Sequence, residues 1–565
     1  MAKVISIGKQ SFSVLREHDY FFVDKTHFIK EWWENGDDTT LIARPRRFGK
    51  TLNMSMLECF FSKQYANRAD LFEGLSIWND EEYRKLQGTY PVIFLSFAAV
   101  KADNLKDAKT QIKQQLADLY EKHRYLLDRN ILSDNQRDIY NSTTEKMDDT
   151  TAQKALGNLS AWMEKYYGRK VIILLDEYDT PMQEAYVQGY WDEFTGFVRS
   201  LFNATFKTNP SLERAIMTGV TRVSKESIFS DLNNLRVVTT TSDMYVDSFG
   251  FTEDEVFAAL DEFGMSDRKD EVKEWYDGFT FGTHRDIYNP WSITNYLKEG
   301  KLHPYWAATS SNGLVSRLIR VASVDVKEKM EDLLKRKEIV VNFDEQIVYD
   351  QLDHNEDAIW SLLLASGYLK VENVDYRGIT REPWYSLSIT NIETLSMYVT
   401  MFRGWYESSK AHYGDFVKAL TEGDLEAMNY YMNRIALATF SYFDVGDGNE
   451  PERFYHGFVL GLIAEREGIY EIRSNRESGF GRYDIMMIPV DPGNNPAIII
   501  EFKVCGRMKK ETMEDAVQSA LKQIAEKNYD AELLSQGIPA DRIRHYGFAF
   551  EGKKVLIGTE PAVCL

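Results

Sequence analysis

Residues 39–51 are Thr39-Thr-Leu-Ile-Ala43 followed by Arg44-Pro-Arg-Arg-Phe-Gly-Lys50-Thr51. The first run predicts a short buried strand, and the residues after Thr51 have helical character, so we expect a strand, a loop and a helix in that order. A loop of this kind presents backbone amides at a helix N-terminus, where they bind phosphate groups. The stretch therefore predicts a phosphate-binding site at the edge of an α/β sheet.

The end of the loop carries the groups that a nucleoside triphosphate requires. Arg47, Phe48 and Gly49 supply backbone N–H groups that can surround phosphate oxygens. Lys50 can reach the β- and γ-phosphates, and the Thr51 hydroxyl is a suitable ligand for Mg²⁺. We predict that these residues bind ATP and that Thr51 is a metal ligand.

The start of the loop departs from the usual G-x-x-x-x-G-K-[ST] pattern. Arg44 replaces the first glycine of that pattern, and Pro45 has no backbone N–H to donate. We therefore expect a loop geometry that differs from the usual one.

A second motif supports nucleotide binding. Val171-Ile-Ile-Leu-Leu175 predicts a buried strand that ends in Asp176 and Glu177. In this position Asp176 can hold Mg²⁺ and Glu177 can polarise a water molecule, so we predict a metal ligand and a catalytic residue. A strand ending in two acids is also a common helix-capping arrangement, and that alternative remains open for this motif alone. The two motifs in chain order favour ATP binding.

Arg222 is a further candidate in the same part of the chain. It follows Thr218, at the end of the apolar run 215–220. There an arginine can sense the γ-phosphate or neutralise charge in the transition state, so we predict a catalytic role. A surface arginine paired with an acid explains the pattern equally well.

The composition predicts a folded protein with several domains. The chain has 565 residues, of which 13% are aromatic. Its formal net charge of −20 opposes charge-driven wrapping of nucleic acid, so any such binding must be local. Residues 451–565 hold 15 Lys plus Arg against 17 Asp plus Glu, which makes this segment the better candidate for contact with nucleic acid.

The cysteines and the hydropathy pattern predict a cytoplasmic protein. Cys59, Cys505 and Cys564 form no C-x-x-C pair, which disfavours a disulfide framework and a thiolate zinc site. The N-terminus has no basic segment followed by an apolar stretch, and the longest aliphatic runs are too short to cross a membrane. We expect no membrane interaction.

Short apolar runs alternate with longer amphipathic stretches in the first part of the chain. The runs are residues 40–43, 91–97, 171–175, 215–220 and 236–240. Such runs suit strands buried on both faces with helices between them, so the fold class we predict is α/β, with a P-loop NTPase parallel sheet as the core.

Helical periodicity predominates from Thr252 to about residue 440, and Thr252 with Glu255 makes a capping box. We expect a helical lid and a helical connector there, and a new α/β domain after the turn-rich stretch 446–451. The predicted domains are residues 1–245, 246–445 and 446–565.

A second candidate site lies near the C-terminus. Two strand-like runs, 482–489 and 497–504, are joined by a turn-rich stretch and predict a hairpin. Folding the hairpin about residue 493 brings Asp484 opposite roughly residue 502, and the period of two places Glu501 and Lys503 on one face. Two carboxylates and an ammonium should therefore converge.

This set of groups suits the hydrolysis of a phosphodiester bond. Asp484 and Glu501 offer hard oxygen ligands for Mg²⁺, which stabilises developing charge and activates a water molecule. Lys503 can position that water or offset the charge of the transition state. We predict that all three are catalytic and that the two acids are metal ligands. A lone E-x-K on a strand is also a common pattern of a solvent-facing ion pair.

The chain resembles a known group of bacterial proteins. The resemblance rests on Phe22-Val-Asp-Lys-Thr26, Arg44-Pro-Arg-Arg-Phe-Gly-Lys-Thr51, Leu175-Asp-Glu-Tyr-Asp-Thr-Pro181, Gly219-Val-Thr-Arg-Val-Ser-Lys225, Tyr276-Asp-Gly-Phe279 and Tyr288-Asn-Pro-Trp291. These stretches look like the AAA-ATPase-like domain of proteins that also carry a C-terminal PD-(D/E)XK nuclease domain, and the likeness covers nearly the whole chain. It implies an ATPase core with a helical lid, in which Asp24 and Lys25 lie near the nucleotide.

The C-terminal segment resembles the PD-(D/E)XK nuclease fold in the order and spacing of its parts. Asp484 and Glu501-Phe-Lys503 are followed by a helix with Gln523 and Tyr529. The resemblance implies that Gln523 makes a hydrogen bond within the site, although a helix-surface amide fits the pattern equally well.

We therefore predict an ATP-binding and ATP-hydrolysing protein whose nucleotide state governs a Mg²⁺-dependent nuclease that cuts DNA or RNA. The alternative is a nucleotide-dependent switch or scaffold whose C-terminal fold binds a partner or nucleic acid without catalysis. The acidic overall charge is the argument for that alternative. The sequence is compatible with an oligomer but does not decide the oligomeric state.

Overall fold

The protein consists of two compact units. The first comprises residues 1–318 and 336–395, and the second residues 319–335 and 396–565. The computed structural model describes residues 3–128, 131–222, 229, 232–307, 314–315, 318–319, 322–345, 349, 352, 355, 357–407, 413–439, 455, 458–460, 462–463, 468–474, 477–478, 481–505, 512–551 and 554–559. Within these residues, no helix is both long enough and apolar enough to cross a membrane.

A five-stranded parallel sheet forms the centre of the first unit. Its strands are β1 (Thr39–Ala43), β2 (Val92–Ser96), β3 (Val171–Asp176), β4 (Leu212–Gly219) and β5 (Leu235–Val238). Their order is β2-β3-β4-β1-β5, and every neighbouring pair is parallel. The strands β1 and β3 are buried along their whole length. The five apolar runs of the sequence all belong to this sheet, so the predicted parallel α/β core is confirmed.

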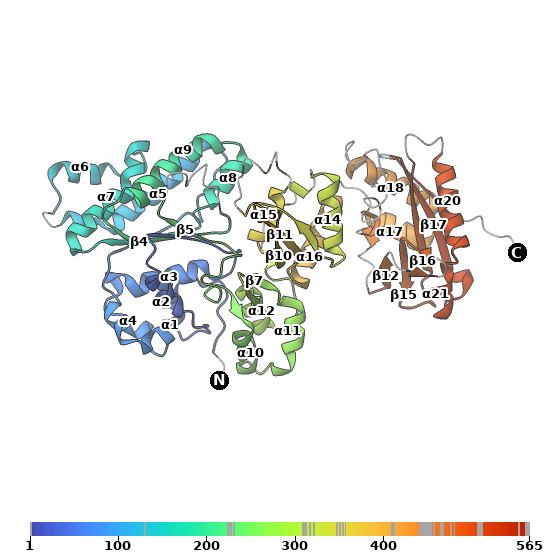
Figure 1. The fold of residues 1–565 in the computed structure, drawn as a ribbon, viewed down its shortest axis with the longest axis horizontal. Helices are drawn as coiled ribbons and strands as arrows, with labels where there is room; N and C mark the ends of the chain where they lie inside the picture. The colour runs from blue at the N-terminus through green and yellow to red at the C-terminus, as the bar shows by residue number, and fades with distance from the viewer. Residues whose placement is uncertain are drawn as a thin grey trace. The chain divides into compact units, whose positions relative to one another are not determined.

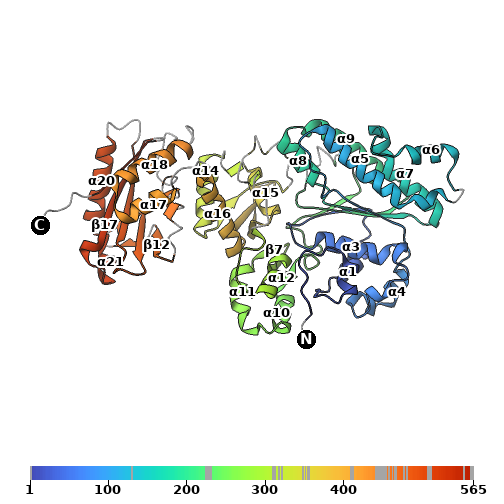
Figure 2. The ribbon, with the colours of Figure 1, turned by 180° about the vertical axis from the view of Figure 1, so that it is seen from behind.

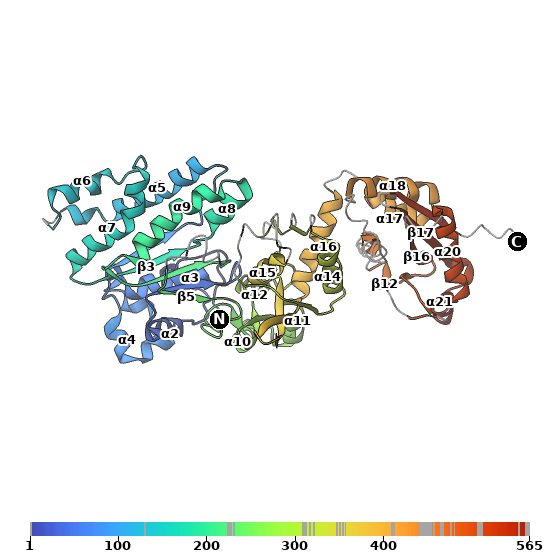
Figure 3. The same ribbon diagram turned by 45° about the horizontal axis from the view of Figure 1, so that its top comes forward.

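Helices cover both faces of the parallel sheet (Figures 1 and 3). One face carries α5 (Leu105–Lys122), α6 (Asp134–Ser142), α7 (Asp149–Tyr167), α8 (Thr180–Gln188) and α9 (Trp191–Phe202). The other face carries α1 (Phe12–Glu17), α2 (His27–Asn35), α3 (Lys50–Phe61) and α4 (Glu81–Leu86). Because parallel strands end at one edge of a sheet, the loops after β1, β3 and β4 meet at that edge.

A lid of helices and short strands follows the parallel sheet in the chain. Its helices are α10 (Glu253–Glu262), α11 (Lys269–Tyr276) and α12 (Pro290–Glu299), and α10 begins with the predicted capping box between Thr252 and Glu255. The strands β6 (Phe251–Thr252), β7 (Phe279–Phe281) and β8 (His284–Tyr288) form an antiparallel sheet in the order β6-β8-β7.

Residues 336–395 of the first unit contain a further small sheet and its helices, and we call this segment the hairpin module. It contains β9 (Ile339–Val341), α15 (Ala358–Ala365), β10 (Leu369–Arg377), β11 (Glu382–Ile389) and the first residues of α16 (Ile392–Glu407). The strands are antiparallel, in the order β10-β11-β9. The sequence predicted helices here but not these strands, because few residues of β10 and β11 are fully buried and neither strand contains a continuous apolar run.

The second unit is built around a mixed five-stranded sheet. Its strands are β12 (Tyr470–Ser474), β15 (Ile485–Pro489), β16 (Ala497–Val504), β17 (Ile543–Glu551) and β18 (Lys554–Thr559), in that order, and only β16 and β17 pair in parallel. The unit also contains α14 (Val324–Leu334), α17 (Tyr413–Glu422), α18 (Leu425–Thr439), α20 (Met513–Glu526), α21 (Asp530–Ser535) and a small ribbon of β13 (Glu477–Ser478) with β14 (Gly481–Arg482).

Alternating side chains of this sheet face two separate cores. Ile485 and Met487 pack with α17 and α18, whereas Met486 and Ile488 pack with α20 and α21 on the opposite face. Figure 2 shows these two pairs of helices on opposite sides of the sheet. The alternation follows from the period of two in a strand. The predicted C-terminal α/β domain is confirmed.

Helix α18 protects the edge of this sheet through two asparagines one turn apart. Asn429 donates to the carbonyl of Ile557 and accepts from its N–H, both at 2.8 Å. Asn433 makes the same pair of hydrogen bonds with Val555, at 2.6 and 2.9 Å. Each amide thus takes the place of a neighbouring strand for β18. The sequence-based boundary at residue 446 assigned α17 and α18 to the connector, whereas both helices pack within the second unit.

We predict that N429A and N433A each destabilise the second unit by about 1–2 kcal/mol, because each removes two hydrogen bonds from a partly buried strand edge. Chemical denaturation of the full chain, followed by a probe in the second unit, measures this loss. E426A, which changes an exposed residue of the same helix, is the control. Equal stability of N433A and E426A would contradict the role of the asparagines.

Candidate functional site

The loop between β1 and α3 has the backbone conformation of an anion site. Arg47 and Gly49 both have left-handed backbone angles, with φ of +69° and +81°, and Gly49 directly precedes α3. Left-handed residues within a turn direct neighbouring N–H groups toward one side, where they can bind an anion. The N-terminus of α3 adds its positive end to the same place.

The ammonium of Lys50 is buried beneath this loop. It donates to the carbonyls of Arg44 at 3.1 Å and Pro45 at 3.0 Å, and it lies 3.7 Å from Oε1 of Glu177. Only 3% of Lys50 is exposed. A buried ammonium that contacts two neutral carbonyls and one distant carboxylate remains well placed to attract phosphate oxygens.

Asp176 connects the loop to the parallel sheet. Its two carboxylate oxygens accept hydrogen bonds from the hydroxyls of Thr51 at 2.8 Å and Thr218 at 2.6 Å. Burial raises the pKa of this carboxyl above its usual range, and the neighbouring charge of Glu177 raises it further. Thr51, Asp176 and Thr218 come from α3, β3 and β4, so one carboxylate fixes the ends of three elements.

Asp179 holds the loop after β4, and the sequence did not single it out. Its Oδ2 accepts from the N–H groups of Val220 at 2.9 Å and Thr221 at 2.7 Å, and from the Thr221 hydroxyl at 2.7 Å. A Cβ at Gly219 would lie 2.6 Å from Oδ1 of Asp179, so this close approach requires glycine. The signal was present as a third acid within Leu175–Pro181.

The phosphate loop and the end of β3 line one cavity of about 570 Å³. Its lining includes the predicted residues Arg47, Phe48, Gly49, Lys50, Thr51, Asp176 and Glu177. Other parts of the wall come from the N-terminal segment, the end of β2, helix α8 and the lid, with Ile7, Phe21, Ala98, Gln183 and Trp291 among them. The volume is in the range of small-molecule and cofactor sites.

Arg44 explains how the loop manages without its first glycine. The Arg44 side chain is fully buried and donates to the carbonyls of Ala43 at 3.3 Å, Met244 at 3.1 Å and Thr239. Its guanidinium also lies over the ring of Phe281 in β7, 4.4 Å from the ring centre. Arg44 thus anchors the start of the loop from inside the fold, and burial lowers the pKa of its guanidinium to about 9.

The lid motifs that the sequence singled out contact this same loop. Phe48 is buried against Phe279 and Phe281, with ring centres 4.7 and 5.4 Å apart. Asn289 caps α12 and donates to the carbonyl of Arg46 at 3.4 Å. The guanidinium of Arg47 lies over the ring of Trp291, 4.3 Å from its centre.

Asp24 and Lys25 have different surroundings. Lys25 lines the cavity and pairs with Glu255 of α10 at 2.6 Å. Asp24 accepts from the N–H and hydroxyl of Thr26, at 2.9 and 2.7 Å, and from the N–H of Ser76 at 2.6 Å. Asp24 therefore fixes local structure, and Lys25 connects the wall of the cavity to the lid.

Arg222 does not line this cavity. It lines a much smaller cavity together with Thr239 and Glu345. The structure therefore does not bring the predicted Arg222 together with Lys50 and Asp176. The spacing after Thr218 suggested a phosphate contact, but the loop after β4 directs its hydrogen bonds toward Asp179 instead.

The second predicted site forms on the hairpin of β15 and β16. Ile485 pairs with Ile500 and Met486 with Ile499, so the register continued by one residue places Asp484 opposite Glu501. This register differs by one residue from the predicted one. The difference matters because Glu501, unlike Phe502, shares the face of the sheet that packs against α20.

The acids and the lysine of the hairpin converge on that face. Glu501 is 2% exposed, and its Oε1 lies 3.4 Å from the ammonium of Lys503. Asp484 accepts a hydrogen bond from the N–H of Phe502 at 2.8 Å, which orients its carboxylate beside Glu501. Burial raises the pKa of Glu501 to about 8, and the charge of Asp484 contributes to this rise.

Helix α20 supplies a further contact to Glu501. The amide of Gln523 donates to Oε1 of Glu501 and, at 3.2 Å, to the hydroxyl of Tyr529. Tyr529 in turn donates to the carbonyl of Arg482 at 2.6 Å. The hydrogen bond expected of Gln523 is therefore present.

Comparison with known proteins finds one family match in each unit. Residues 6–229 match the family described as "Predicted AAA-ATPase", and residues 450–560 match the PD-(D/E)XK nuclease superfamily. The chain joins an AAA-ATPase-like domain to a PD-(D/E)XK nuclease superfamily domain. It is also 27% identical over 394 residues to an uncharacterized protein in the vnfD 5' region of Azotobacter chroococcum mcd 1, with 69% of this chain and 68% of that protein covered.

The residues of the nuclease superfamily domain fit a divalent cation. Oε2 of Glu501 is buried and has no hydrogen-bond partner among the residues that the structure describes, whereas Oε1 has two. A buried carboxylate oxygen without a donor is costly unless a cation or a proton satisfies it. Oxygen ligands from Asp484 and Glu501 are the type that Mg²⁺ prefers.

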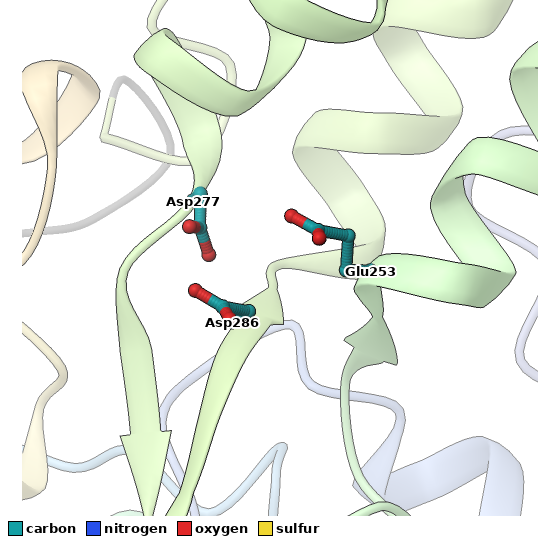
Figure 4. Close-up of side chains that lie close together, drawn as sticks. All are labelled: Glu253, Asp277 and Asp286. Atoms are coloured by element: carbon teal, nitrogen blue, oxygen red, sulfur yellow. The ribbon is translucent and has the colours of Figure 1, made fainter.

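The lid of the AAA-ATPase-like domain contains one more group of acids. Glu253, Asp277 and Asp286 offer carboxylate oxygens within 4.8 Å of one another, and Figure 4 shows the three side chains directed toward a common centre. Lys273 pairs with Glu253, and the hydroxyl of Tyr288 donates to Glu253 at 3.3 Å. Burial and the neighbouring Asp286 raise the pKa of Asp277 to about 7.

We predict that D277N is more stable than the natural protein at pH 8 and that this gain disappears toward pH 4. Because the folded-state pKa of Asp277 is raised, folding favours its protonated form, and stability is lost as the pH rises from about 4 through 7. Thermal unfolding at several pH values measures the effect. E274Q, which changes an exposed acid on the adjoining helix, serves as the control. A gain that does not vary with pH would contradict the assignment.

Proposed function

We propose that the protein binds and hydrolyses ATP in its first unit and cleaves DNA or RNA in its second unit, each with Mg²⁺. One observation carries this proposal: both units place a lysine ammonium beside a carboxylate, at 3.7 Å for Lys50 and Glu177 and at 3.4 Å for Lys503 and Glu501. The two domain families support ATPase and nuclease chemistry in general terms. We further propose a cytoplasmic location, which the cysteine content favours.

In the first unit, the phosphate chain of ATP occupies the anion site at the start of α3. Lys50 exchanges its contacts with the Arg44 and Pro45 carbonyls for phosphate oxygens, which frees Glu177 to orient the attacking water. Thr51 and Asp176 would hold Mg²⁺, which neutralises phosphate charge when it is bound.

In the second unit, Asp484 and Glu501 would hold Mg²⁺, which supplies an activated water and stabilises charge at the phosphorus. Gln523 fixes the orientation of Glu501, and Lys503 offsets the charge that develops on the phosphate. The near-balanced charge of residues 451–565 allows a polyanion to approach this unit more readily than it approaches the rest of the acidic chain.

We predict that K50A lowers the affinity for ATP by about 10- to 100-fold, because it removes a charge-assisted contact with the phosphates. Isothermal titration calorimetry with ATP and Mg²⁺ measures this loss. K106A removes an exposed lysine of α5 and is the matched control. Unchanged affinity in K50A would refute the assignment of the phosphate site.

We predict that K503A and E501Q each lower Mg²⁺-dependent cleavage of nucleic acid by at least about 100-fold, because each removes a charge from the catalytic set. The affinity for ATP should stay unchanged in both variants. The assay uses the full chain with single-stranded and double-stranded DNA and with RNA, with Mg²⁺ or EDTA. K522A, an exposed lysine on α20, is the control. Cleavage that persists in both variants would locate the activity elsewhere. If the natural protein cleaves none of these nucleic acids, the alternative of a binding scaffold is favoured.

A further inference from the structure

The hairpin module contacts the loop after β1, which forms the phosphate site. Gly367, just before β10, has a left-handed backbone with φ of +81°. A Cβ at this position would lie 2.9 Å from Cγ of Pro45 and 2.9 Å from Cε1 of Phe279. The phosphate loop, the lid strand β7 and the hairpin module are therefore packed too closely here for any side chain, and a displacement of Pro45 displaces residue 367 as well.

The same module contacts the loop after β4. The hydroxyls of Thr221 and Tyr349 lie 3.1 Å apart, and Thr221 also donates to Asp179 at 2.7 Å. Since the Thr221 hydroxyl has only one hydrogen, Tyr349 is the donor to Thr221. Tyr349 is fully buried and packs against Tyr186 and Trp191, with ring centres 5.3 and 5.2 Å away. The hydroxyl of Thr221 thus links Asp179 to Tyr349.

A third contact reaches the loop after β5. Glu345 accepts hydrogen bonds from the hydroxyls of Thr239 at 3.0 Å and Thr241 at 2.6 Å. It also accepts from the hydroxyl of Tyr385 in β11 at 2.9 Å. The carbonyl of Thr239 accepts a hydrogen bond from Arg44. Glu345 is therefore linked through Thr239 to the first residue of the phosphate loop.

The hairpin module ends in the first residues of helix α16, and the lid contacts the chain just before that helix. A Cβ at Gly278 would lie 1.9 Å from the carbonyl oxygen of Thr390, and Asn391 donates to the carbonyl of Tyr276 at 3.0 Å. Asn391 also accepts from the N–H of Thr394 at 2.9 Å, in the first turn of α16. The helix continues past residue 395, where the first unit ends, into residues of the second unit.

We propose that the hairpin module senses the nucleotide state and transmits it to helix α16, which contains one of the covalent links between the two units. This inference rests on the proposed binding of ATP. Bound phosphates draw Lys50 and the loop after β1 toward them, and they thereby change the field at Asp179, on which the charges of Glu177 and Lys50 act. The module touches the loops after β1, β4 and β5. The module responds because its contacts differ between the position of the loop with ATP and its position without ATP. A ligand shifts a conformation only through such a difference.

The test is hydrogen exchange of the full chain with and without ATP and Mg²⁺, compared between the natural protein and the double variant E345Q/Y349F. Both substitutions keep the size of the side chain and weaken or remove the polar contacts with the loops. In the natural protein, we expect ATP to change exchange rates in residues 44–55, 358–389 and 392–407 by at least about fivefold. In the variant, the change in residues 44–55 should persist, and the changes in the other two segments should be lost. Y305F, which removes an exposed hydroxyl of the lid region, is the matched control and should behave like the natural protein.

The outcomes separate this inference from the function on which it rests. If ATP protects residues 44–55 but leaves residues 358–407 unchanged in the natural protein, or changes them equally in the double variant, the inference is wrong and ATP binding stands. If ATP fails to protect residues 44–55, the proposed binding of ATP is wrong, and the inference falls with it.

Discussion

The carboxylate of Asp176 is the contact on which the nucleotide site depends. It receives the hydroxyls of Thr51 and Thr218 and so joins α3, β3 and β4 at the edge where parallel strands end. Burial keeps this carboxylate away from water, so those hydroxyls and nearby charges, such as Lys50, are what stabilise it. The phosphate loop can therefore begin with an arginine in place of glycine. The buried Arg44 side chain fixes the start of the loop, and Asp176 fixes its end through Thr51.

In the second unit, a β-hairpin brings the acidic side chains together. Opposite residues of β15 and β16 share a face, so Asp484 and Glu501 are brought together by register alone, and α20 covers them with Gln523. Burial next to another acid raises the pKa of Glu501, and its Oε2 has no hydrogen-bond partner within the described part of the chain. A protein tolerates such a cost where a cation or a reaction requires it.

Much of this arrangement could be predicted from the sequence, because the strongest patterns are local. The apolar runs of β1 and β3 are buried along their whole length and so carry a clear signal, and the motif Asp176-Glu177 falls where the second of these runs ends. The hairpin register was missed by one residue because the turn at residues 490–496 does not reveal where its centre lies. The sequence did not place α18 beside the C-terminal sheet, because the asparagines of α18 that pair with β18 carry no hydrophobic pattern. Asp179 and the hairpin module escaped prediction for a further reason: their contacts join residues far apart in the chain.

The central proposal is that each unit holds one divalent cation near a lysine, at Thr51 and Asp176 in the first unit and at Asp484 and Glu501 in the second. Crystals of the full chain grown with ATP and Mn²⁺ test it most directly, because anomalous scattering locates manganese without prior assumptions. The account predicts one peak between Thr51 and Asp176 and another between Asp484 and Glu501. Manganese bound only at other acids of the protein would contradict it.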